Sequence, residues 1–560
     1  MDLSGHLRAA SSILVLGAAL AAAPVSAEQG SGPAPTTAAP LPAAAALAPG
    51  AQTFRRDLAA ETAALAAPTR DAIDGFFAAR GYAPFWTEPG SGRAEALVAA
   101  IADSPAQGLP ARGYDLPGVE ATLASGQPED RAGAEVAATL AYLAFAGDLS
   151  GGVVRPRDID PEIDLRPKRP SPAALLALLE TEPVPQVLQG LEPSGSEYRT
   201  LIAEKTRLEG LIASDAWGAG VPEGPTLHAG ESGPRIADLR ARLGRMGYAA
   251  PAGAGGDAAF DSGLQAAVEA FQRDNGLIDD GAAGARTISA INAGPEKRLS
   301  QVLVNLERLR WQDGDPGPRY FRVNIPDFSV TLRDQGTVLW QSRVVVGELK
   351  TRTAEFSDVM TYMVVNPTWH IPDSIAVRSF LPKLQRDPNV LQRQNIRLLT
   401  RGGTEINPAL VDFTQYTPEN FPFRIKQRPD TDNALGKVKF IFPNNHSIYM
   451  HDTPHRELFA RDARAFSNGC IRLEKPVELA QVLLGAQGTA DPAATFDGLL
   501  AGGKERRVDL DRPIPVHIEY RTVFVDDAGT VRYRSDIYGR DAEVFRALQA
   551  AGVALPAAQG

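Results

Sequence analysis

Residues 446–473 read HSIYMHDTPHRELFARDARAFSNGCIRL, and this stretch decides both the fold and the chemistry of the chain. Alternating apolar residues predict one short strand over 448–450 and a second over 471–473. Cys470, the single cysteine of the chain, stands between Gly469 and the second strand. His451 ends the first strand, 19 positions earlier (470 − 451). A glycine beside the thiol lets a substrate approach the backbone closely.

Two strand ends joined by a loop can bring the His451 imidazole and the Cys470 thiol together. A thiol beside a protonated imidazole has a lowered pKa and becomes a nucleophilic thiolate. The alternative is a buried structural cysteine, which behaves as a small apolar side chain. The pattern therefore predicts either a cysteine nucleophile with a histidine partner or a packed thiol.

The neighbouring residues carry a family resemblance. His451-Asp452-Thr453-Pro454, followed by Ser467-Asn468-Gly469-Cys470-Ile471-Arg472-Leu473, resembles the signature of L,D-transpeptidases, cysteine enzymes that cross-link peptidoglycan stem peptides. Asn366-Pro367-Thr368-Trp369 with Ile371-Pro372 matches a second recurring segment of that family. Many relatives carry histidine where Asn468 stands, but the large scaffold-bearing branch tends to lack it. An asparagine cannot act as a base, so the resemblance leaves that role to His451.

The resemblance implies a mechanism. Cys470 attacks the carbonyl of the third stem residue of a tetrapeptide donor, usually meso-diaminopimelate, and expels D-alanine. His451 activates the thiol and protonates the leaving amine, while the backbone carbonyl of Asp452 holds the imidazole. The N–H groups of Gly469 and Cys470, helped by the Tyr449 hydroxyl, hold the oxyanion. A diaminopimelate acceptor then gives a 3→3 cross-link, and no metal or organic cofactor is needed.

Five residues are candidates for binding substrate: Tyr449, Arg472, Trp369, Ser467 and Asn468. Arg472 shares a strand face with Cys470, so it either holds a stem carboxylate through two hydrogen bonds or forms a structural ion pair. For Tyr449 and Trp369 the alternative role is packing. His446 and His455 lie nearby without the ligand spacing of a hydrolytic zinc site, so we predict no metal centre.

Outward from this stretch, alternating apolar residues predict a β-rich catalytic domain over 320–525. Residues 373–432 interrupt the strand pattern with helical and loop-like sequence, and we expect them to form an inserted lid or substrate-binding subdomain. Alternating apolar residues after the cysteine strand are expected to complete the sheet. Residues 526–560 are expected to add a hairpin and a closing helix.

Upstream, residues 52–220 are expected to form a helical scaffold without chemically active residues, and 294–319 a return helix and linker. Residues 233–293 predict three helices with apolar stripes. Phe260-Asp261, Ala267-Val268, Ala270-Phe271-Gln272, Gly276-Leu277, Gly284 and Thr287 resemble the peptidoglycan-binding helical domain, and the alternative is a generic bundle. The whole set resembles the large periplasmic branch of the L,D-transpeptidase family.

The N-terminus predicts export. Arg8, an apolar run and Val25-Ser26-Ala27 predict a signal peptide over 1–27, with a retained anchor as the alternative. Residues 28–51 are rich in Ala and Pro and predict a tether. No later apolar run reaches membrane-spanning length. We therefore expect a periplasmic protein with no membrane span after cleavage.

Composition narrows the class of protein. The chain has 560 residues and a formal net charge of −10, which argues against coating nucleic acid or anionic membrane. One cysteine excludes an intramolecular disulfide and a zinc site built of several thiolates. The fold class is therefore multidomain α+β: helical scaffold, three-helix module and β-rich catalytic domain with an inserted lid.

Alternatives to the transpeptidase remain open. The same fold would serve an L,D-carboxypeptidase or a hydrolase of peptidoglycan-linked proteins, and acceptor access past residues 373–432 would discriminate them. A non-catalytic wall-binding protein is the third reading, and the intact Cys470, His451 and Gly469 argue against it. The resemblance also implies a part in cell-wall organisation and cell shape, and acylation by carbapenems. Whether the scaffold recruits cell-wall synthesis proteins as partners stays open.

Overall fold

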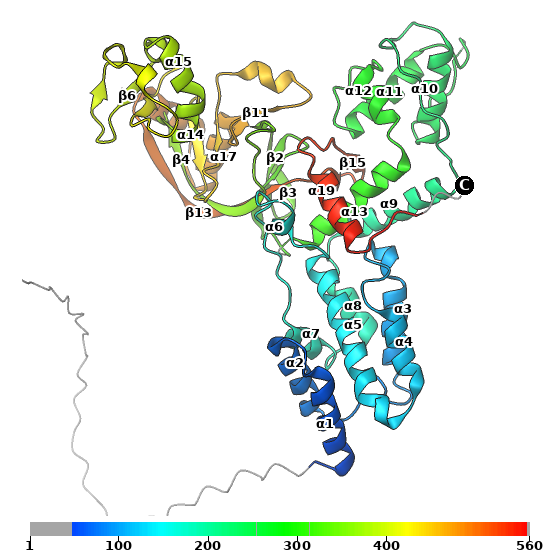
Figure 1. Ribbon diagram of the computed structural model, residues 1–560. Helices are drawn as coiled ribbons and strands as arrows, with labels where there is room; N and C mark the ends of the chain where they lie inside the picture. The colour runs from blue at the N-terminus through cyan, green and yellow to red at the C-terminus, as the bar shows by residue number, and fades with distance from the viewer. Residues whose placement is uncertain (1–46, 254, 313, 557–560) are drawn as a thin grey trace, which may run out of the picture. The chain divides into compact units, whose positions relative to one another are not determined.

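The computed structural model describes residues 47–556 except 254 and 313 (Figure 1). The predicted signal peptide, and the predicted linker up to residue 46, lie outside these residues. From Pro49 onward the described chain forms one compact unit. Within it no helix is long and apolar enough to cross a membrane.

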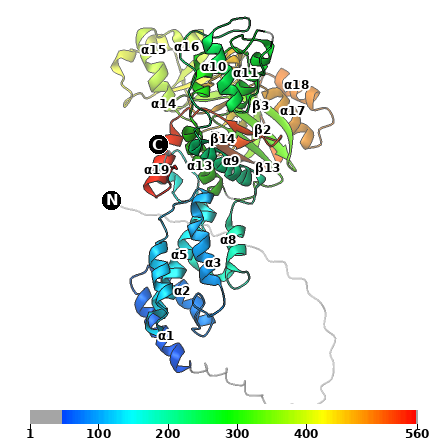
Figure 2. The ribbon, with the colours of Figure 1, turned by 90° about the vertical axis from the view of Figure 1, so that its right-hand side faces the viewer.

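In the described residues from Pro49 to Ala213 the chain forms nine α-helices, as expected for a helical scaffold. They are α1 (Pro49–Thr62), α2 (Ala67–Ala79), α3 (Arg93–Ala102), α4 (Leu116–Ser125), α5 (Arg131–Gly151), α6 (Pro156–Ile159), α7 (Pro172–Leu178), α8 (Val184–Leu191) and α9 (Ser196–Ala213). The long helix α5 packs against α1, α3, α4, α7 and α8. Figure 2 shows α1, α3, α5 and α8 lying together. Its buried Glu135 accepts the backbone N–H groups of Phe85, Trp86 and Thr87, which fixes this turn of the chain in the core.

The predicted three-helix module is confirmed. Its helices are α10 (Pro234–Arg245), α11 (Ser262–Asp274) and α12 (Ala285–Ile291). Asp261 caps α11 by accepting the Leu264 N–H at 2.9 Å, which satisfies one of the unpaired N–H groups of the first turn. The apolar stripes of the helices, including Leu239, Val268 and Phe271, meet in one buried core.

Helix α13 (Pro295–Arg310) leads into a nine-stranded sheet. Its strands are β1 (Arg319–Asn324), β2 (Ser329–Asp334), β3 (Thr337–Gly347), β4 (Phe356–Val365), β9 (Val438–Ile441), β10 (Met450–His451), β11 (Ala465–Ser467), β12 (Ile471–Leu473) and β13 (Arg506–Glu519). The order is β11-β3-β12-β10-β9-β4-β13-β1-β2, and β2 also pairs with β3, so the strands close on themselves. The predicted cysteine and histidine strands are neighbours, because β10 and β12 pair in parallel. Helices α17 (Pro476–Ala486) and α18 (Pro492–Ala501) follow β12.

The insertion differs from the expected helical and loop-like segment, because it contains a second, four-stranded antiparallel sheet. The order is β5 (Trp369–Ile371), β8 (Arg424–Gln427), β6 (Ile396–Leu399) and β7 (Glu405–Ile406). Helices α14 (Asp373–Ile375), α15 (Leu381–Arg386) and α16 (Val390–Arg393) and a π-helical turn η3 (Ala376–Phe380) lie beside it (Figure 1). These strands are too short to show an alternating pattern. The subdomain has a hydrophobic core of its own that includes Phe380, Leu398 and Phe413.

A hairpin and a helix lie at the C-terminal end of the described chain, and the hairpin begins at Val523, inside the expected catalytic domain and not at residue 526. They comprise β14 (Val523–Val525), β15 (Val531–Tyr533) and α19 (Arg540–Ala550). Strand β13 completes the large sheet, whereas β14 pairs only with β15. The hairpin and helix share a core with α9 and α13, in which Val523, Val544 and Leu548 are fully buried.

Candidate active site

The Cys470 loop is held by short hydrogen bonds within it. Ser467 Oγ donates to the Cys470 carbonyl at 2.6 Å and accepts the Gly469 N–H at 3.1 Å. Gly469 has φ +109°, a conformation that side chains rarely adopt, so the glycine permits the turn before the thiol. Cys470 is half-buried and Asn468 is exposed. The Gly469 N–H, expected to hold an oxyanion, therefore binds the Ser467 hydroxyl in this structure.

A second loop, residues 347–353, supports the cysteine loop from behind. Thr351 Oγ1 donates to the Ser467 carbonyl at 3.1 Å, and Thr353 Oγ1 donates to the Gly469 carbonyl at 2.8 Å. Tyr538 donates to the Gly347 carbonyl at 2.6 Å and accepts the Thr353 N–H at 3.2 Å. Sequence reasoning missed these supports, because none of them belongs to a motif.

His451 lies on β10 opposite Arg472 of β12. Its Nδ1 lies 2.5 Å from the Asp452 carbonyl oxygen, so an N–H at Nδ1 donates to that carbonyl and Nε2 becomes the basic nitrogen. The Asp452 carboxylate accepts the N–H groups of Lys437 and Thr453 at 2.8 and 2.7 Å, which holds the turn after the histidine. The ring of Tyr449 lies 5.6 Å from that of His451, between ring centres.

The thiol and the imidazole do not share a hydrogen bond among the described residues; the Cys470 thiol donates to the Ser447 carbonyl at 3.6 Å. Burial raises the pKa of Cys470 to about 11, against the lowering effect of hydrogen bonds from Tyr449 and the charge of Arg472. Burial also lowers the pKa of His451 to about 3, and Arg472 adds to that shift. The expectation of a lowered thiol pKa is therefore wrong for this structure, because desolvation outweighs the neighbouring charges. Both groups are neutral at pH 7.

Arg472 is half-buried, and within the described chain no carboxylate forms an ion pair with it. Burial lowers the pKa of Arg472. Among the described residues no hydrogen bond or ion pair occupies the N–H donors of its guanidinium. Of the two roles open from the sequence, a structural ion pair is not observed. The guanidinium next to Cys470 thus remains available to a carboxylate ligand.

Trp369 belongs to the inserted subdomain. It begins β5, and its ring contacts Phe380 edge-on at 6.4 Å between ring centres. In the described chain no hydrogen bond or ring contact joins Trp369 to Cys470 or His451. The preceding residue, Thr368, places its carbonyl 3.4 Å from Lys439 Nζ, and Lys439 pairs with His451 across the sheet. Trp369 therefore packs at the base of the insertion.

Arg378, in the π-helical turn η3, is a site residue that sequence reasoning missed. Its Nη2 donates to Asn468 Oδ1 at 2.6 Å, so the insertion contacts the loop that carries the cysteine. No sequence signal singles out this arginine among the many of the insertion. In the part of the chain that the structure describes, no group of three or more His, Cys, Asp and Glu side chains is arranged to hold a metal ion.

Comparisons with known families match three separate parts of the chain. Residues 71–204 match a scaffold domain, residues 232–291 match a family described as "Putative peptidoglycan binding domain", and residues 318–509 match an L,D-transpeptidase catalytic domain. A Haemophilus influenzae protein named "Putative L,D-transpeptidase" is 35% identical over 256 residues, which are 45% of this chain and 51% of that protein. The chain thus spans about half the length of this curated relative.

Two solved structures are also similar. An L,D-transpeptidase from Mycobacterium smegmatis is 11% identical, with 36% of this chain and 58% of that chain covered and a TM-score of 0.19. An L,D-transpeptidase from Stackebrandtia nassauensis is 12% identical, with 54% of this chain and 98% of that chain covered and a TM-score of 0.20.

His451, Gly469, Cys470 and Arg472 all lie inside the segment that matches the catalytic domain. These matches agree with the expected resemblance of the three regions to a scaffold domain, a peptidoglycan-binding domain and an L,D-transpeptidase catalytic domain. The chain carries an L,D-transpeptidase catalytic domain, preceded by a scaffold domain and a peptidoglycan-binding domain.

Proposed function

We propose that this protein is a periplasmic L,D-transpeptidase that forms 3→3 cross-links between diaminopimelate residues of peptidoglycan stems. The observation that carries the proposal is the arrangement around the thiol. Cys470 lies on a loop held by Ser467, next to the strand of a buried neutral histidine whose Nδ1 contacts the Asp452 carbonyl. Cys470, His451 and the Asp452 carbonyl are the nucleophile, the base and the orienting group that a cysteine acyltransferase needs. The thiol and the imidazole share no hydrogen bond among the described residues, so we propose that their contact forms when substrate binds.

In the first half-reaction Cys470 Sγ attacks the carbonyl carbon of the third stem residue, and His451 Nε2 takes the thiol proton. Because both groups are neutral before attack, the proton moves as the bond forms. The Asp452 carbonyl then stabilises the imidazolium through Nδ1–H. The bond to D-alanine breaks, its amine takes the proton from His451, and a thioester remains on Cys470.

In the second half-reaction the side-chain amine of an acceptor diaminopimelate attacks the thioester carbonyl. The amine proton passes through His451 to the leaving thiolate, so the free thiol and the neutral imidazole are restored. We propose the Cys470 N–H and the Tyr449 hydroxyl as oxyanion donors, joined by the Gly469 N–H if it exchanges Ser467 Oγ for the oxyanion. Arg472 would hold a stem carboxylate.

The wider context follows from the domain matches. We propose the domain limits 52–220, 233–293 and 320–525, with residues 1–27 as a cleaved signal peptide. The wall-binding module would keep the enzyme on its polymeric substrate, and a carbapenem would acylate the same thiol. A carboxypeptidase would differ only in that water replaces the acceptor amine.

Product analysis tests the proposal. Residues 28–560 and their Cys470→Ala variant are incubated with disaccharide-tetrapeptide, and products are followed by liquid chromatography and mass spectrometry. We expect a cross-linked dimer with loss of one D-alanine, absent from the variant. Tripeptide without dimer would establish a carboxypeptidase instead, and absence of turnover in both samples would contradict the enzymatic proposal.

A further inference from the structure

A short acidic segment of the scaffold contacts the catalytic domain directly after α6. Ile163 forms a parallel β-bridge with Glu355, in which the Asp164 N–H donates to the Glu355 carbonyl at 2.8 Å. The Glu355 N–H donates to the Glu162 carbonyl at 2.8 Å in return. The segment lies inside the matched scaffold domain, whereas Glu355 directly precedes β4 of the catalytic sheet. We call residues 160–164 the acidic brace.

Asp160 and Glu162 of the acidic brace contact the loop of residues 347–353, which binds the cysteine loop. Arg352 donates from Nε to Glu162 at 2.7 Å and lies 3.2 Å from Asp160 through Nη2. Its two neighbours are Thr351 and Thr353, whose hydroxyls bind the carbonyls of Ser467 and Gly469. The fully buried Arg540 lies 3.3 Å from Asp160 and 3.2 Å from Glu162, which fixes the two carboxylates.

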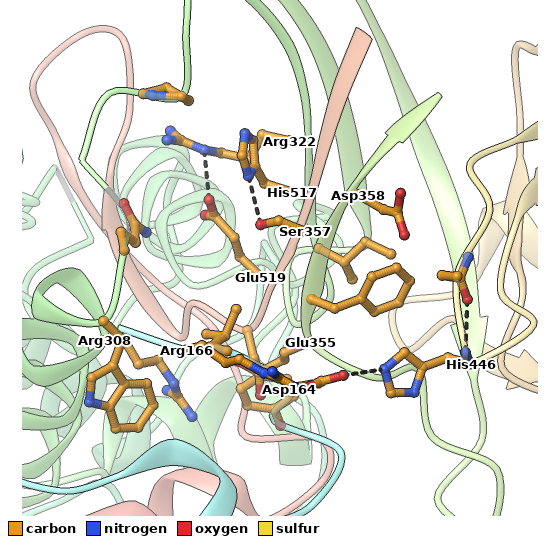
Figure 3. A pocket seen from close by; sticks show the side chains of 18 of the residues that line it. Asp164, Arg166, Arg308, Arg322, Glu355, Ser357, Asp358, His446, His517 and Glu519 are labelled. Carbon is orange, nitrogen blue, oxygen red and sulfur yellow. Dashed lines mark hydrogen bonds and ion pairs between the residues drawn. The ribbon is translucent and has the colours of Figure 1, made fainter. Parts of the chain in front are cut away.

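Asp164 of the acidic brace contacts a second loop, residues 444–448, whose Ser447 binds the Cys470 thiol. Asp164 Oδ2 lies 3.0 Å from His446 Nε2, and both residues line a cavity of about 500 Å³ (Figure 3). The imidazole of His446 stacks on Phe356 at 4.8 Å between ring centres. Ser447 follows with φ +56°, and its carbonyl accepts the Cys470 thiol. None of the predicted catalytic residues lines this cavity. Asp164 and His446 therefore affect the thiol through the loop that contains Ser447, and not by direct contact.

The side chain of Asn444 stiffens that loop. Its Oδ1 accepts the N–H groups of His446 and Ile448 at 3.0 and 3.2 Å, and its Nδ2 donates to the Ile448 carbonyl at 2.7 Å. A displacement of His446 is therefore transmitted to Ser447, which lies between the bonded residues. The acidic brace thus contacts both loops whose atoms bind the Cys470 loop.

We propose that Asp160, Glu162 and Asp164 of the scaffold are positioning residues for Cys470, so that the scaffold domain is part of the catalytic machinery. The proposal rests on the proposed function, because it takes Cys470 as the nucleophile. A nucleophile misplaced by about 1 Å can lose on the order of 100-fold in rate. Contacts at both sides of the cysteine loop oppose such a displacement.

Two readouts test the proposal in residues 28–560. Alkylation by iodoacetamide reports on Cys470 alone, because the chain has one cysteine, and it needs no substrate. Turnover of disaccharide-tetrapeptide gives kcat and KM separately. For Asp164→Ala we expect kcat about tenfold lower, KM within about twofold, and the pH midpoint of alkylation about one unit lower as the released thiol becomes solvated. Asp164→Asn should restore most of kcat, because its amide oxygen still accepts from His446.

The matched control is Asp158→Ala, an exposed carboxylate of α6 that we expect to leave both readouts unchanged. Glu162→Gln is the second variant, used if Asp164→Ala fails to fold. It removes only the charge of a side chain that is 41% exposed, so the protein should tolerate it. We expect Glu162→Gln to lower kcat about threefold and, like Asp164→Ala, to lower the pH midpoint of alkylation. Wild-type kcat and midpoint in these variants would overturn the proposal. So would a lower kcat with an unshifted midpoint. If the wild-type enzyme gives no turnover, the proposed function fails, and the alkylation midpoint alone decides the positioning role.

Discussion

Arg378 of the inserted subdomain donates from Nη2 to Asn468 Oδ1 at 2.6 Å, two residues before Cys470. The contact joins two parts of the chain that have separate hydrophobic cores, one in the insertion and one in the large sheet. Both partners are exposed, so the hydrogen bond can break without leaving a buried polar group. If the insertion acts as the expected lid, this hydrogen bond would hold it against the loop that carries Cys470.

Arg378→Ala should therefore weaken substrate retention more than chemistry. A hydrogen bond between exposed groups contributes about 1 kcal/mol, so we expect KM for disaccharide-tetrapeptide to rise about fivefold with kcat nearly unchanged. Asn468→Ala should have a similar effect, and the double variant should add little to either single change. Steady-state kinetics of the four proteins measures the coupling. Arg386→Ala, which removes an exposed arginine of the same subdomain, is the matched control. Fully additive effects would show that the Arg378–Asn468 hydrogen bond does not contribute to substrate retention.

The raised pKa of Cys470 predicts how its reactivity depends on pH. Because burial raises that pKa to about 11, the thiolate fraction should grow about tenfold per pH unit between pH 7 and 10. The rate of iodoacetamide alkylation should follow that rise, whereas the same protein unfolded in urea should titrate near about 8.5. A plateau of rapid alkylation below pH 8 would instead indicate a preformed thiolate–imidazolium pair.

Arg472→Lys keeps the positive charge next to Cys470 but removes the planar fork of donors. If Arg472 binds a stem carboxylate through two hydrogen bonds, kcat/KM should fall about tenfold, which corresponds to about 1.4 kcal/mol. In Arg472→Gln kcat/KM should fall further. The pKa of His451 should rise in this variant, because the arginine charge lowers that pKa. Arg461→Lys, on the exposed surface nearby, serves as the control. Unchanged kinetics for Arg472→Lys would argue against carboxylate binding.

Burial of neutral His451 predicts a loss of stability in acid. Its pKa in the folded protein, about 3, lies below the ordinary 6.5, so the unfolded chain binds the proton more readily. The stabilisation is complete above about pH 6.5 and is lost as the pH falls toward 3, by at most about 5 kcal/mol. His451→Gln should flatten this part of the stability curve. Urea unfolding followed by circular dichroism at pH 7 and pH 4 measures it; parallel curves for the two proteins would contradict the assignment.

The parts of the site that sequence predicted are those that lie close together on adjacent strands. His451 and Arg472 are in register because β10 and β12 pair directly, and the Asp452 carbonyl contacts His451 through the next peptide unit. Arg378, Thr353 and Asp164 reach the site from 90 residues before Asn468, 116 before Gly469 and 282 before His446, and no local pattern marks them. Their contribution depends on tertiary contacts.

The pKa of the Cys470 thiol could not be predicted from the sequence either, because it also depends on tertiary packing. The residue types around Cys470 favour a thiolate, since Arg472 lowers the pKa of the thiol. Burial acts in the opposite direction and is the larger effect, and burial is set by the packing of the whole sheet. The four-stranded sheet of the insertion was likewise missed, because strands of two to four residues are too short to carry a period.

The mass of the enzyme during turnover tests most directly whether Cys470 is the nucleophile that carries the acyl group. Residues 28–560 are mixed with disaccharide-tetrapeptide, quenched in acid within the first turnovers and analysed by intact-protein and peptide mass spectrometry. We predict an adduct of the disaccharide-tripeptide acyl group, without the terminal D-alanine, on the peptide that contains Cys470. Cross-linked product formed by Cys470→Ala, or turnover with the adduct on another residue, would contradict it.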